Sequence, residues 1–140
     1  MNFLTYFIVK DMAASTAFYK AFLGQEPAGG QPERFVIFNA SLALYNPSYD
    51  DELIKSGVDL SDHFNAAYLA NKETSINYGN NVILNFTVND LVAEYERVKS
   101  LNIGTVSEIM YVNIAMPYRF FWLNDPDGNY LEITGEYTPR

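Results

Sequence analysis

Cysteine is absent from this chain of 140 residues, and histidine and tryptophan occur once each. The lack of cysteine excludes disulfides, thiolate catalysis and cysteine-based zinc sites. The single histidine, His63, lies in a polar stretch and is expected to be a solvent-side loop residue. It does not suit a Ser/His/Asp triad.

Positive charge is scarce, with 9 Lys and Arg against 17 Asp and Glu, giving a net charge of −8. Because such a field repels phosphates, nucleic acid and anionic membranes are not expected as partners. The acidic run at residues 50–52 is expected to be a helix start.

Long hydrophobic runs and glycine-rich phosphate loops are also missing. The apolar start at residues 2–9 is too short to span a bilayer and is expected to form a buried first strand rather than a signal peptide. The expected location is the cytoplasm. Ala28-Gly29-Gly30-Gln31 is not followed by a helical pattern, so it does not indicate phosphate binding.

Aromatic residues are abundant, at 16% of the chain, with 11 Tyr and 10 Phe among them. Apolar residues make up 49% of the chain, which is enough for one compact unit or for two halves that share a core. Tyrosine in such numbers suits walls that are partly dry and partly wet, as in ligand cavities and interfaces.

An internal repeat organises the chain. The block that ends in Val9-Lys10-Asp11-Met12 is similar to the block that ends in Val88-Asn89-Asp90-Leu91, and the offset is the same throughout. Each block reads as an apolar strand, an Asp N-cap and a helix. The helices are predicted at about 12–23, stopped by Gly24, and at about 91–101, stopped by Asn102.

Three strand-like runs follow each predicted helix. They lie at 25–28, 34–38 and 42–45 in the first half, and at 105–110, 119–123 and 130–136 in the second. The turn at 125–129, Asp-Pro-Asp-Gly-Asn, separates the last two and is expected to be structural. The polar connection 47–79 is expected to be loop with short helical turns near 51–55 and 61–69.

These features resemble the vicinal oxygen chelate superfamily, the group of glyoxalases, bleomycin resistance proteins and extradiol dioxygenases. The opening strand and helix, with Val-Lys-Asp-Met and Ala-Phe-Tyr-Lys-Ala-Phe-Leu-Gly, and the closing segment 119–133 carry the resemblance. It implies an α+β fold in which two βαβββ repeats form an open curved mixed sheet around a cavity, with helices on the convex side. The expected single domain spans 1–140, with repeats at 1–46 and 80–140.

The resemblance also implies a metal bound by side chains from four strands. Carried over to this sequence, the ligand positions fall on Leu4, Ala43, Ile83 and Glu132, and only Glu132 can ligate a cation. A shift of two residues would bring in Tyr6 and Asn85, which are poor substitutes. A catalytic divalent ion needs about three protein ligands, so we expect no metal and no other cofactor.

Alternation along the strands predicts which side chains face the cavity. Glu132 is the candidate catalytic residue, either as a general acid or base or as a solvated remnant of a metal site. The ligand-binding candidates are Tyr6, Tyr45, Asn85, Tyr111, Tyr118 and Trp122. Each has a simpler interpretation as packing, and for Trp122 this would be the gap between sheet and helix. Tyr111 and Tyr118 are placed on the connection between the sixth and seventh strands, at the cavity mouth or a dimer interface.

Two functions remain open at this point, besides that of a structural or regulatory dimer that binds no small ligand. The first is a metal-free protein that binds or sequesters a small organic molecule in an aromatic-lined cavity. The alternative is a glyoxalase-like lyase or isomerase with a divergent metal site or with Glu132 as general acid or base. A homodimer is expected in either case.

Overall fold

The computed structural model describes residues 1–39, 41–72, 75–79, 82–113 and 115–139. The chain divides into two compact units, one of Met1–Thr16 and Glu26–Asn77 and the other of Ala17–Gln25 and Tyr78–Arg140. Each unit is built around one four-stranded sheet. The predicted start of the second repeat, residue 80, lies outside the described residues.

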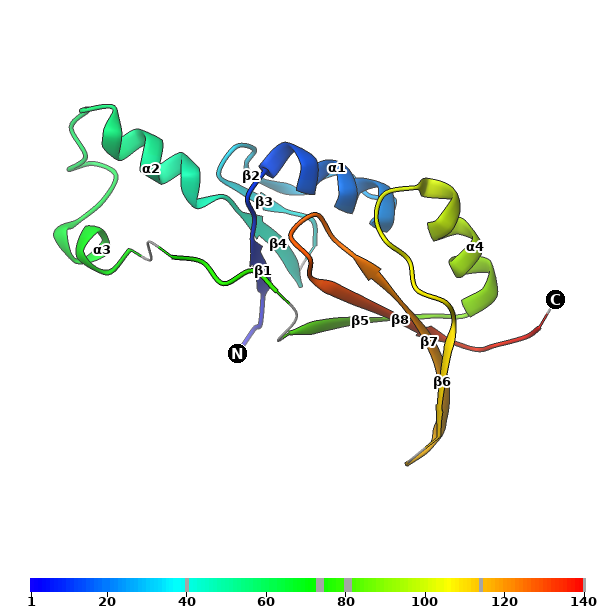
Figure 1. Cartoon of the computed structure of the whole chain (residues 1–140). Coiled ribbons are helices and arrows are strands. Elements are labelled where there is room, and N and C mark those ends of the chain that lie inside the picture. Colours follow the sequence, from blue (N-terminus) through cyan, green and yellow to red (C-terminus); the bar gives the residue numbers. More distant parts are fainter. Residues whose placement is uncertain (40, 73–74, 80–81, 114, 140) are drawn as a thin grey trace. The chain divides into compact units, whose positions relative to one another are not determined.

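The first repeat consists of β1 (Thr5–Ile8), α1 (Met12–Leu23), β2 (Gly29–Gln31), β3 (Phe35–Ile37) and β4 (Leu42–Tyr45). Its strands lie in the order β1-β4-β3-β2, with β1 parallel to β4 and the other pairs antiparallel (Figure 1). Helices α2 (Pro47–Lys55) and α3 (Ala66–Asn71) follow in the connection.

The second repeat consists of β5 (Ile83–Val88), α4 (Leu91–Leu101), β6 (Met110–Asn113), β7 (Pro117–Asn124) and β8 (Tyr130–Gly135). The strand order is β5-β8-β7-β6, and β5 is parallel to β8. The order within each sheet is therefore the same in both repeats. The predicted α+β fold of two βαβββ repeats is confirmed.

The helix starts and stops follow from their capping residues. Asp11 and Asp90 each accept a hydrogen bond from the backbone N–H three residues later, at 3.0 and 2.9 Å, as an N-cap does. Gly24 and Asn102 both adopt positive φ angles, of 63° and 51°, directly after the two helices. The predicted helix boundaries at residues 12–23 and 91–101 are confirmed.

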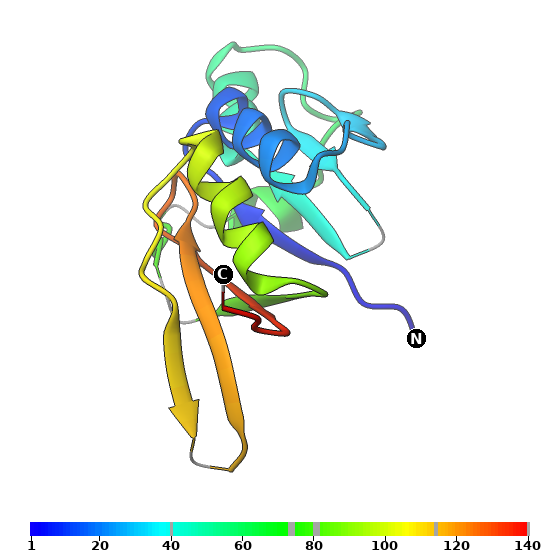
Figure 2. The ribbon, with the colours of Figure 1, turned by 90° about the vertical axis from the view of Figure 1, so that its right-hand side faces the viewer.

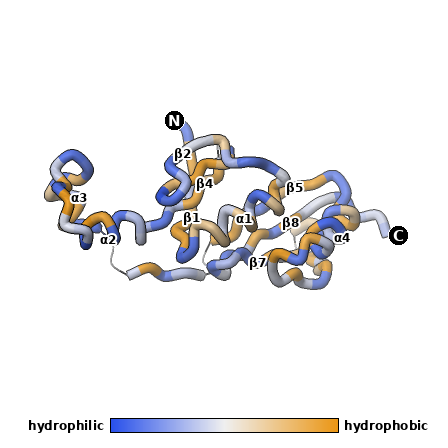
Figure 3. The backbone as a smooth tube through the Cα atoms, turned by 90° about the horizontal axis from the view of Figure 1, so that it is seen from above, coloured by the Kyte–Doolittle hydropathy of each residue, from blue (hydrophilic) through white to orange (hydrophobic). Residues whose placement is uncertain are grey.

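Strand alternation places the core on one face of each sheet. In the first sheet, the buried residues Phe7, Leu44 and Val36 lie side by side across β1, β4 and β3. In the second, Phe121 and Ile133 are fully buried, and the rings of Phe22 and Tyr95 pack edge-on against Phe86 and Phe121, each at 5.1 Å. Helices α1 and α4 thus cover one face of the second sheet, and Figure 2 shows α4 alongside it. Figure 3 shows apolar segments along β1, β4 and β5.

Two strand predictions were wrong in position. The strand expected at 25–28 is β2 at 29–31, where Gly30 adopts a φ of 104° and lies so close to the Phe35 carbonyl that a Cβ atom would collide with it. Glycine at this position therefore permits the pairing of β2 with β3.

The strand expected at 105–110 is β6 at 110–113. Val106 lies opposite Leu123, while Met110 lies opposite Phe120, so four steps on one strand match three on the other. This extra residue forms a bulge that interrupts the ladder before β6 begins. Tyr111 and Tyr118 consequently lie on β6 and β7 themselves, and not on the connection between them.

The turn at 125–129 is organised by the buried Asp125 side chain. Its carboxylate accepts hydrogen bonds from the backbone N–H groups of Asp127 and Asn129, both at 2.9 Å, and from the Tyr19 hydroxyl at 2.7 Å. Burial and the Asp125 carboxylate raise the pKa of Tyr19. The turn is hydrogen-bonded as its sequence predicts, and it connects helix α1 with the second sheet.

Candidate functional site

The face of the second sheet that the helices leave open carries most of the predicted site residues. Glu132 on β8 lies opposite Asn85 on β5 and Trp122 on β7, and Thr134 lies opposite Thr87 and Phe120. Because paired residues of neighbouring strands share a face, these side chains lie together. We call this set the Glu132 face: Asn85, Thr87, Phe120, Trp122, Glu132 and Thr134.

Two neutral donors orient the Glu132 carboxylate. The Asn85 side-chain amide donates to Oε1 at 3.0 Å, and the Trp122 indole N–H donates to Oε2 at 3.2 Å. The hydroxyls of Thr134 and Thr87 donate to the Asn85 carbonyl oxygen at 3.3 and 3.4 Å. Since a carboxylate has about four acceptor sites, Glu132 can accept further hydrogen bonds.

Aromatic rings continue this face along β7. Tyr118 stacks on Phe120 with the ring centroids 5.2 Å apart, and Phe120 lies 5.9 Å from Trp122. Tyr130 packs edge-on against Trp122 at 5.0 Å. Trp122 is half-buried, and it is its neighbour Phe121 that fills the gap between sheet and helix. Trp122 therefore does not fill the gap between sheet and helix, although its ring packs against Tyr130 and Phe120.

The position of Trp122 is set by the bulge before β6. Ser107 exchanges two hydrogen bonds with the Trp122 backbone, because its N–H donates to the Trp122 carbonyl and its hydroxyl accepts from the Trp122 N–H, both at 2.9 Å. These bonds fix the backbone beneath the indole ring.

Tyr111 faces away from Glu132. It lies opposite Arg119 in the β6–β7 ladder, and the Arg119 guanidinium lies 4.6 Å from its ring and 4.3 Å from the ring of Tyr137. Of the two tyrosines predicted on this hairpin, the structure thus brings only Tyr118 onto the side of the sheet that carries Glu132.

Tyr6 and Tyr45 lie on the first sheet. Their rings are 6.3 Å apart, and Tyr6 also contacts Phe35 at 5.4 Å. Tyr6 is 52% exposed, whereas the Tyr45 hydroxyl donates to Asp50 at 3.0 Å. Burial, Tyr68 and Asp50 raise the pKa of Tyr45, which therefore stays protonated as a hydrogen-bond donor.

Asp50 is a candidate functional residue that the sequence patterns did not identify. It is fully buried and accepts hydrogen bonds from the Arg34 guanidinium at 2.6 and 2.9 Å, and from the hydroxyls of Tyr68 at 2.6 Å and Tyr45 at 3.0 Å. Burial alone would raise the pKa of Asp50, but the hydrogen bonds from these three partners outweigh it and lower the pKa. We call these four residues the Asp50 network.

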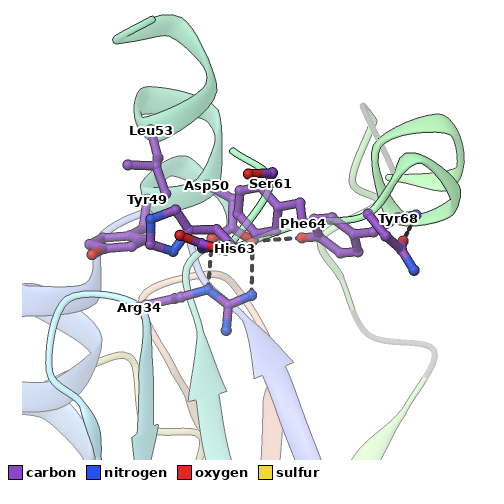
Figure 4. Close-up of a pocket in the computed structure, with 10 residues that line it drawn as sticks. Arg34, Tyr49, Asp50, Leu53, Ser61, His63, Phe64 and Tyr68 are labelled. Atoms are coloured by element: carbon purple, nitrogen blue, oxygen red, sulfur yellow. Dashed lines mark hydrogen bonds and ion pairs between the residues drawn. The ribbon is translucent and has the colours of Figure 1, made fainter. Parts of the chain in front are cut away.

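A pocket of about 610 Å³ adjoins the Asp50 network, between α2, α3 and the segment that joins them (Figure 4). It includes His63, which is exposed as predicted. The sequence signal in this region was Asn46-Pro47, an N-cap followed by a proline, which starts α2 and places Asp50 in its first turn. The lining residues are Arg34, Tyr49, Asp50, Leu53, Ser61, Asp62, His63, Phe64, Asn65 and Tyr68.

The repeated βαβββ architecture, with a carboxylate on the open face of the second sheet, is that of vicinal oxygen chelate proteins. A model of the Glyoxalase/Bleomycin resistance protein/Dioxygenase superfamily matches residues 2–133, and the chain belongs to this superfamily. A search of curated proteins found no match.

Solved structures support the fold assignment. The chain is similar to a lactoylglutathione lyase from Agrobacterium tumefaciens, with 20% identity and a TM-score of 0.63 over 96% of this chain and 92% of that one. It is also similar to a glyoxalase-related enzyme from Fulvimarina pelagi, with 17% identity and a TM-score of 0.61 over 99% and 88%. A mobile-metagenome protein from V. pseudocholerae has 19% identity and a TM-score of 0.60 over 100% and 95%.

The metal that the superfamily resemblance implies does not fit the residues of this chain. The strand register places Asn85 beside Glu132, and Tyr6 beside Ala43. The second sheet thus offers one carboxylate and one amide, and the first a phenol and a methyl group, which is a poor donor set for a divalent ion. Among the described residues, no group of three or more His, Cys, Asp or Glu side chains is placed to hold a metal.

Membrane insertion through a helix finds no support either. In the part of the chain that the structure describes, no helix is both long and apolar enough to cross a bilayer.

Proposed function

We propose that this protein binds a small organic molecule on the Glu132 face without a metal ion. The observation that carries the proposal is the Glu132 carboxylate, held by Asn85 and Trp122 beside a row of aromatic rings. The half-buried ring of Trp122 and the exposed ring of Tyr118 provide an apolar surface for a planar part of the ligand, and the buried Phe120 lies between them on β7. Glu132 accepts a hydrogen bond from a donor group of the ligand, and this combination of few polar groups with aromatic walls suits small-molecule recognition.

The single tryptophan supplies the assay. Because Trp122 is the only tryptophan and lies within the proposed site, a bound ligand should change its emission in a saturable manner. We would titrate a panel of small aromatic and amphipathic compounds and follow this emission. If none gives a saturable change, the proposed binding function is refuted.

A matched pair of variants tests the role of Glu132. Glu132→Gln removes the charge of this hydrogen-bond acceptor. A hydrogen bond to a charged group contributes about 1.5–3 kcal/mol, so binding should weaken about ten-fold or more. Glu136→Gln makes the same change of charge at an exposed residue just after β8 and should bind like the wild type. Equal affinities of the two variants would argue against a contact between Glu132 and the ligand.

The absence of a metal requirement is tested separately. Binding should be unchanged after treatment with EDTA and after addition of Zn²⁺ or Mn²⁺. A loss of binding with EDTA that Zn²⁺ or Mn²⁺ restores would contradict the metal-free proposal.

Acid–base catalysis by Glu132 is a second candidate function. It is favoured by the two hydrogen bonds that orient the carboxylate while leaving acceptor sites open. One similar structure is that of a lactoylglutathione lyase, so turnover of lactoylglutathione is the first reaction to assay. Catalysis predicts that Glu132→Gln abolishes turnover, whereas binding alone predicts no turnover by either form.

We also propose a homodimer. Strands β6 and β7 and the segment between them expose Tyr111 at 53%, Met116 at 68% and Tyr118 at 40%. Tyr111 and Tyr118 lie on opposite faces of this hairpin, so the hairpin offers exposed apolar side chains to a second chain on both faces. Light scattering should give twice the chain mass of 15.9 kDa for the wild type, and the mass of a monomer for Tyr111→Ser/Tyr118→Ser. A monomeric wild type would refute the dimer.

A further inference from the structure

The pocket beside the Asp50 network has the composition of a second small-molecule site. Its volume of about 610 Å³ lies within the range of ligand pockets. The half-buried side chains of Tyr49, Leu53, Phe64 and Tyr68 form its apolar part, whereas Ser61, Asp62, His63 and Asn65 are exposed. Figure 4 shows that Tyr49 and Leu53 come from α2, Tyr68 comes from α3, and His63 and Phe64 come from the segment between them.

The charged residues of the pocket lining determine which charge of the ligand is favoured. Arg34 is held by the buried Asp50 through two hydrogen bonds of 2.6 and 2.9 Å, so these two charges compensate each other. The Asp62 carboxylate is the remaining formal charge of the lining and is exposed. In a chain with a net charge of −8, the pocket should repel anions and attract cations.

The aromatic rings strengthen this selection. Phe64 and Tyr68 stack with ring centroids 4.9 Å apart and an interplanar angle of 24°, and the His63 ring lies 6.3 Å from Phe64. The negative face of an aromatic ring attracts organic cations, and quaternary ammonium groups are recognised by such rings. An exposed carboxylate and half-buried aromatic rings in one pocket lining together favour an ammonium group attached to an apolar body.

We propose that the pocket lined by Tyr49, Asp62, Phe64 and Tyr68 binds a small organic cation, an amine or quaternary ammonium compound with an aromatic or apolar body. Asp62 attracts the charge, and the rings of Phe64 and Tyr68 contact both the ammonium group and the apolar body attached to it. The lining comes from α2, α3, their connection and Arg34, and none of these residues is part of the Glu132 face.

The only histidine of the chain makes binding at this pocket directly observable. His63 lines the pocket, so its imidazole proton resonance is a single reporter for occupancy. We would titrate the protein at fixed pH with benzyltrimethylammonium, with benzyl alcohol as a neutral analogue and with benzoate as an anionic one. The cation should shift the resonance saturably and bind at least about three-fold more tightly than the alcohol, as expected for a partly exposed charge and ring contact. Benzoate should bind more weakly than both.

Two variants separate the local charge from the overall field of the protein. Asp62→Asn should reduce the preference for the cation over the alcohol about three-fold, while the affinity for the alcohol stays the same. Glu52→Gln makes the same change of charge on the exposed side of α2, outside the pocket lining, and should leave the preference unchanged. Phe64→Leu should weaken the binding of both compounds.

Three results would each overturn the proposal: no saturable shift with the cation, equal affinity for cation and alcohol in the wild type, or equal effects of Asp62→Asn and Glu52→Gln. The wild-type comparison needs no variant and therefore does not depend on how a variant folds. Trp122 emission recorded in the same titrations distinguishes the sites. A cation that changes Trp122 emission without moving the His63 resonance binds at the Glu132 face and refutes the second site. If instead no compound changes Trp122 emission, the proposed function of the Glu132 face fails, but a shift of the His63 resonance still supports the second site.

Discussion

Replacing Asp50 by asparagine should destabilise the protein strongly, because Asp50 joins three parts of the chain. Its carboxylate is fully buried and accepts hydrogen bonds from Arg34, Tyr45 and Tyr68. Asparagine has nearly the same shape, but it carries no charge, and one of its two polar groups donates. It therefore presents a donor to at least one partner that is itself a donor.

The magnitude follows from the exposure of the partners. A hydrogen bond to a charged group contributes about 1.5–3 kcal/mol, and breaking a buried ion pair costs about 3–5 kcal/mol. The side chain of Arg34 is 35% exposed, so water compensates part of this loss. We expect Asp50→Asn to lower the free energy of unfolding by about 2–3 kcal/mol, which corresponds to a fall in Tm of about 10 °C.

Urea denaturation followed by circular dichroism measures this loss. Asp51→Asn is the matched control, because Asp51 is the next residue, is 49% exposed and pairs with Lys72 at 2.7 Å. The Lys72 side chain is only 10% exposed, but an asparagine at position 51 can still accept a hydrogen bond from its ammonium group, so the loss should stay at about 1 kcal/mol or less. Tyr68→Phe removes a hydrogen bond to the charged Asp50 and should give an intermediate loss of about 1.5 kcal/mol. If Asp50→Asn and Asp51→Asn unfold with equal free energies, the Asp50 network does not stabilise the fold.

The same variant should change the response to acid. The pKa of Asp50 is lowered in the folded protein, so its contribution is fully present above the unfolded pKa of about 4 and is lost as the pH falls through the folded value. The difference in stability between wild type and Asp50→Asn should therefore be largest near neutral pH and should shrink below about pH 4. A difference that stays constant, or grows, in acid would show that the charge of Asp50 is not the cause.

Three further substitutions should change the free energy of unfolding in a defined direction. Tyr19→Phe removes the buried hydrogen bond to Asp125 and should lower the free energy of unfolding by about 1.5–3 kcal/mol, with no loss in urea titrations refuting a role for this bond. Gly104→Ala places a methyl group against the Asn124 carbonyl and the ring of Phe18 and should cost about 1–3 kcal/mol, which the same titrations measure. Thr16→Val removes a buried hydroxyl that has no hydrogen-bond partner among the described residues and should raise the stability by about 1 kcal/mol, whereas a loss would indicate a partner for that hydroxyl.

The fold was predictable because its signals are local and occur twice. Asp11 and Asp90 follow apolar strands and begin helices, and a residue capable of positive φ ends each helix. Alternation along β5, together with the superfamily resemblance, predicted that Asn85 would share a face with the neighbouring strand's Glu132. Capping and strand periodicity depend only on residues close together in the sequence, so one sequence is enough to recognise them.

The strand positions that were wrong depend on contacts between strands. Residues 105–110 have strand-like composition, but a bulge opposite Leu123 delays the ladder until Met110. The same applies to Asp50, which lies in an acidic run typical of an exposed helix start. Its partner Arg34 is sixteen residues earlier and Tyr68 eighteen residues later, and no local pattern connects them. The tertiary pairing of charges therefore had to come from the structure.

Asp50 and Glu132 differ in how many hydrogen-bond acceptor sites their carboxylates leave available to a ligand, and this difference supports separate roles for the two residues. Asp50 is fully buried, and a guanidinium and two phenols already occupy its oxygens. A ligand could bind to Asp50 only by displacing one of these partners, at the cost of a buried charge without compensation. Glu132 is half-buried and is held by one amide and one indole, both neutral. These donors fix its direction but do not neutralise its charge, so an incoming donor group gains a charged hydrogen bond at a carboxylate that needs no rearrangement. On these grounds Glu132 is the carboxylate for recognition of a ligand, and Asp50 holds the connection between the repeats in place.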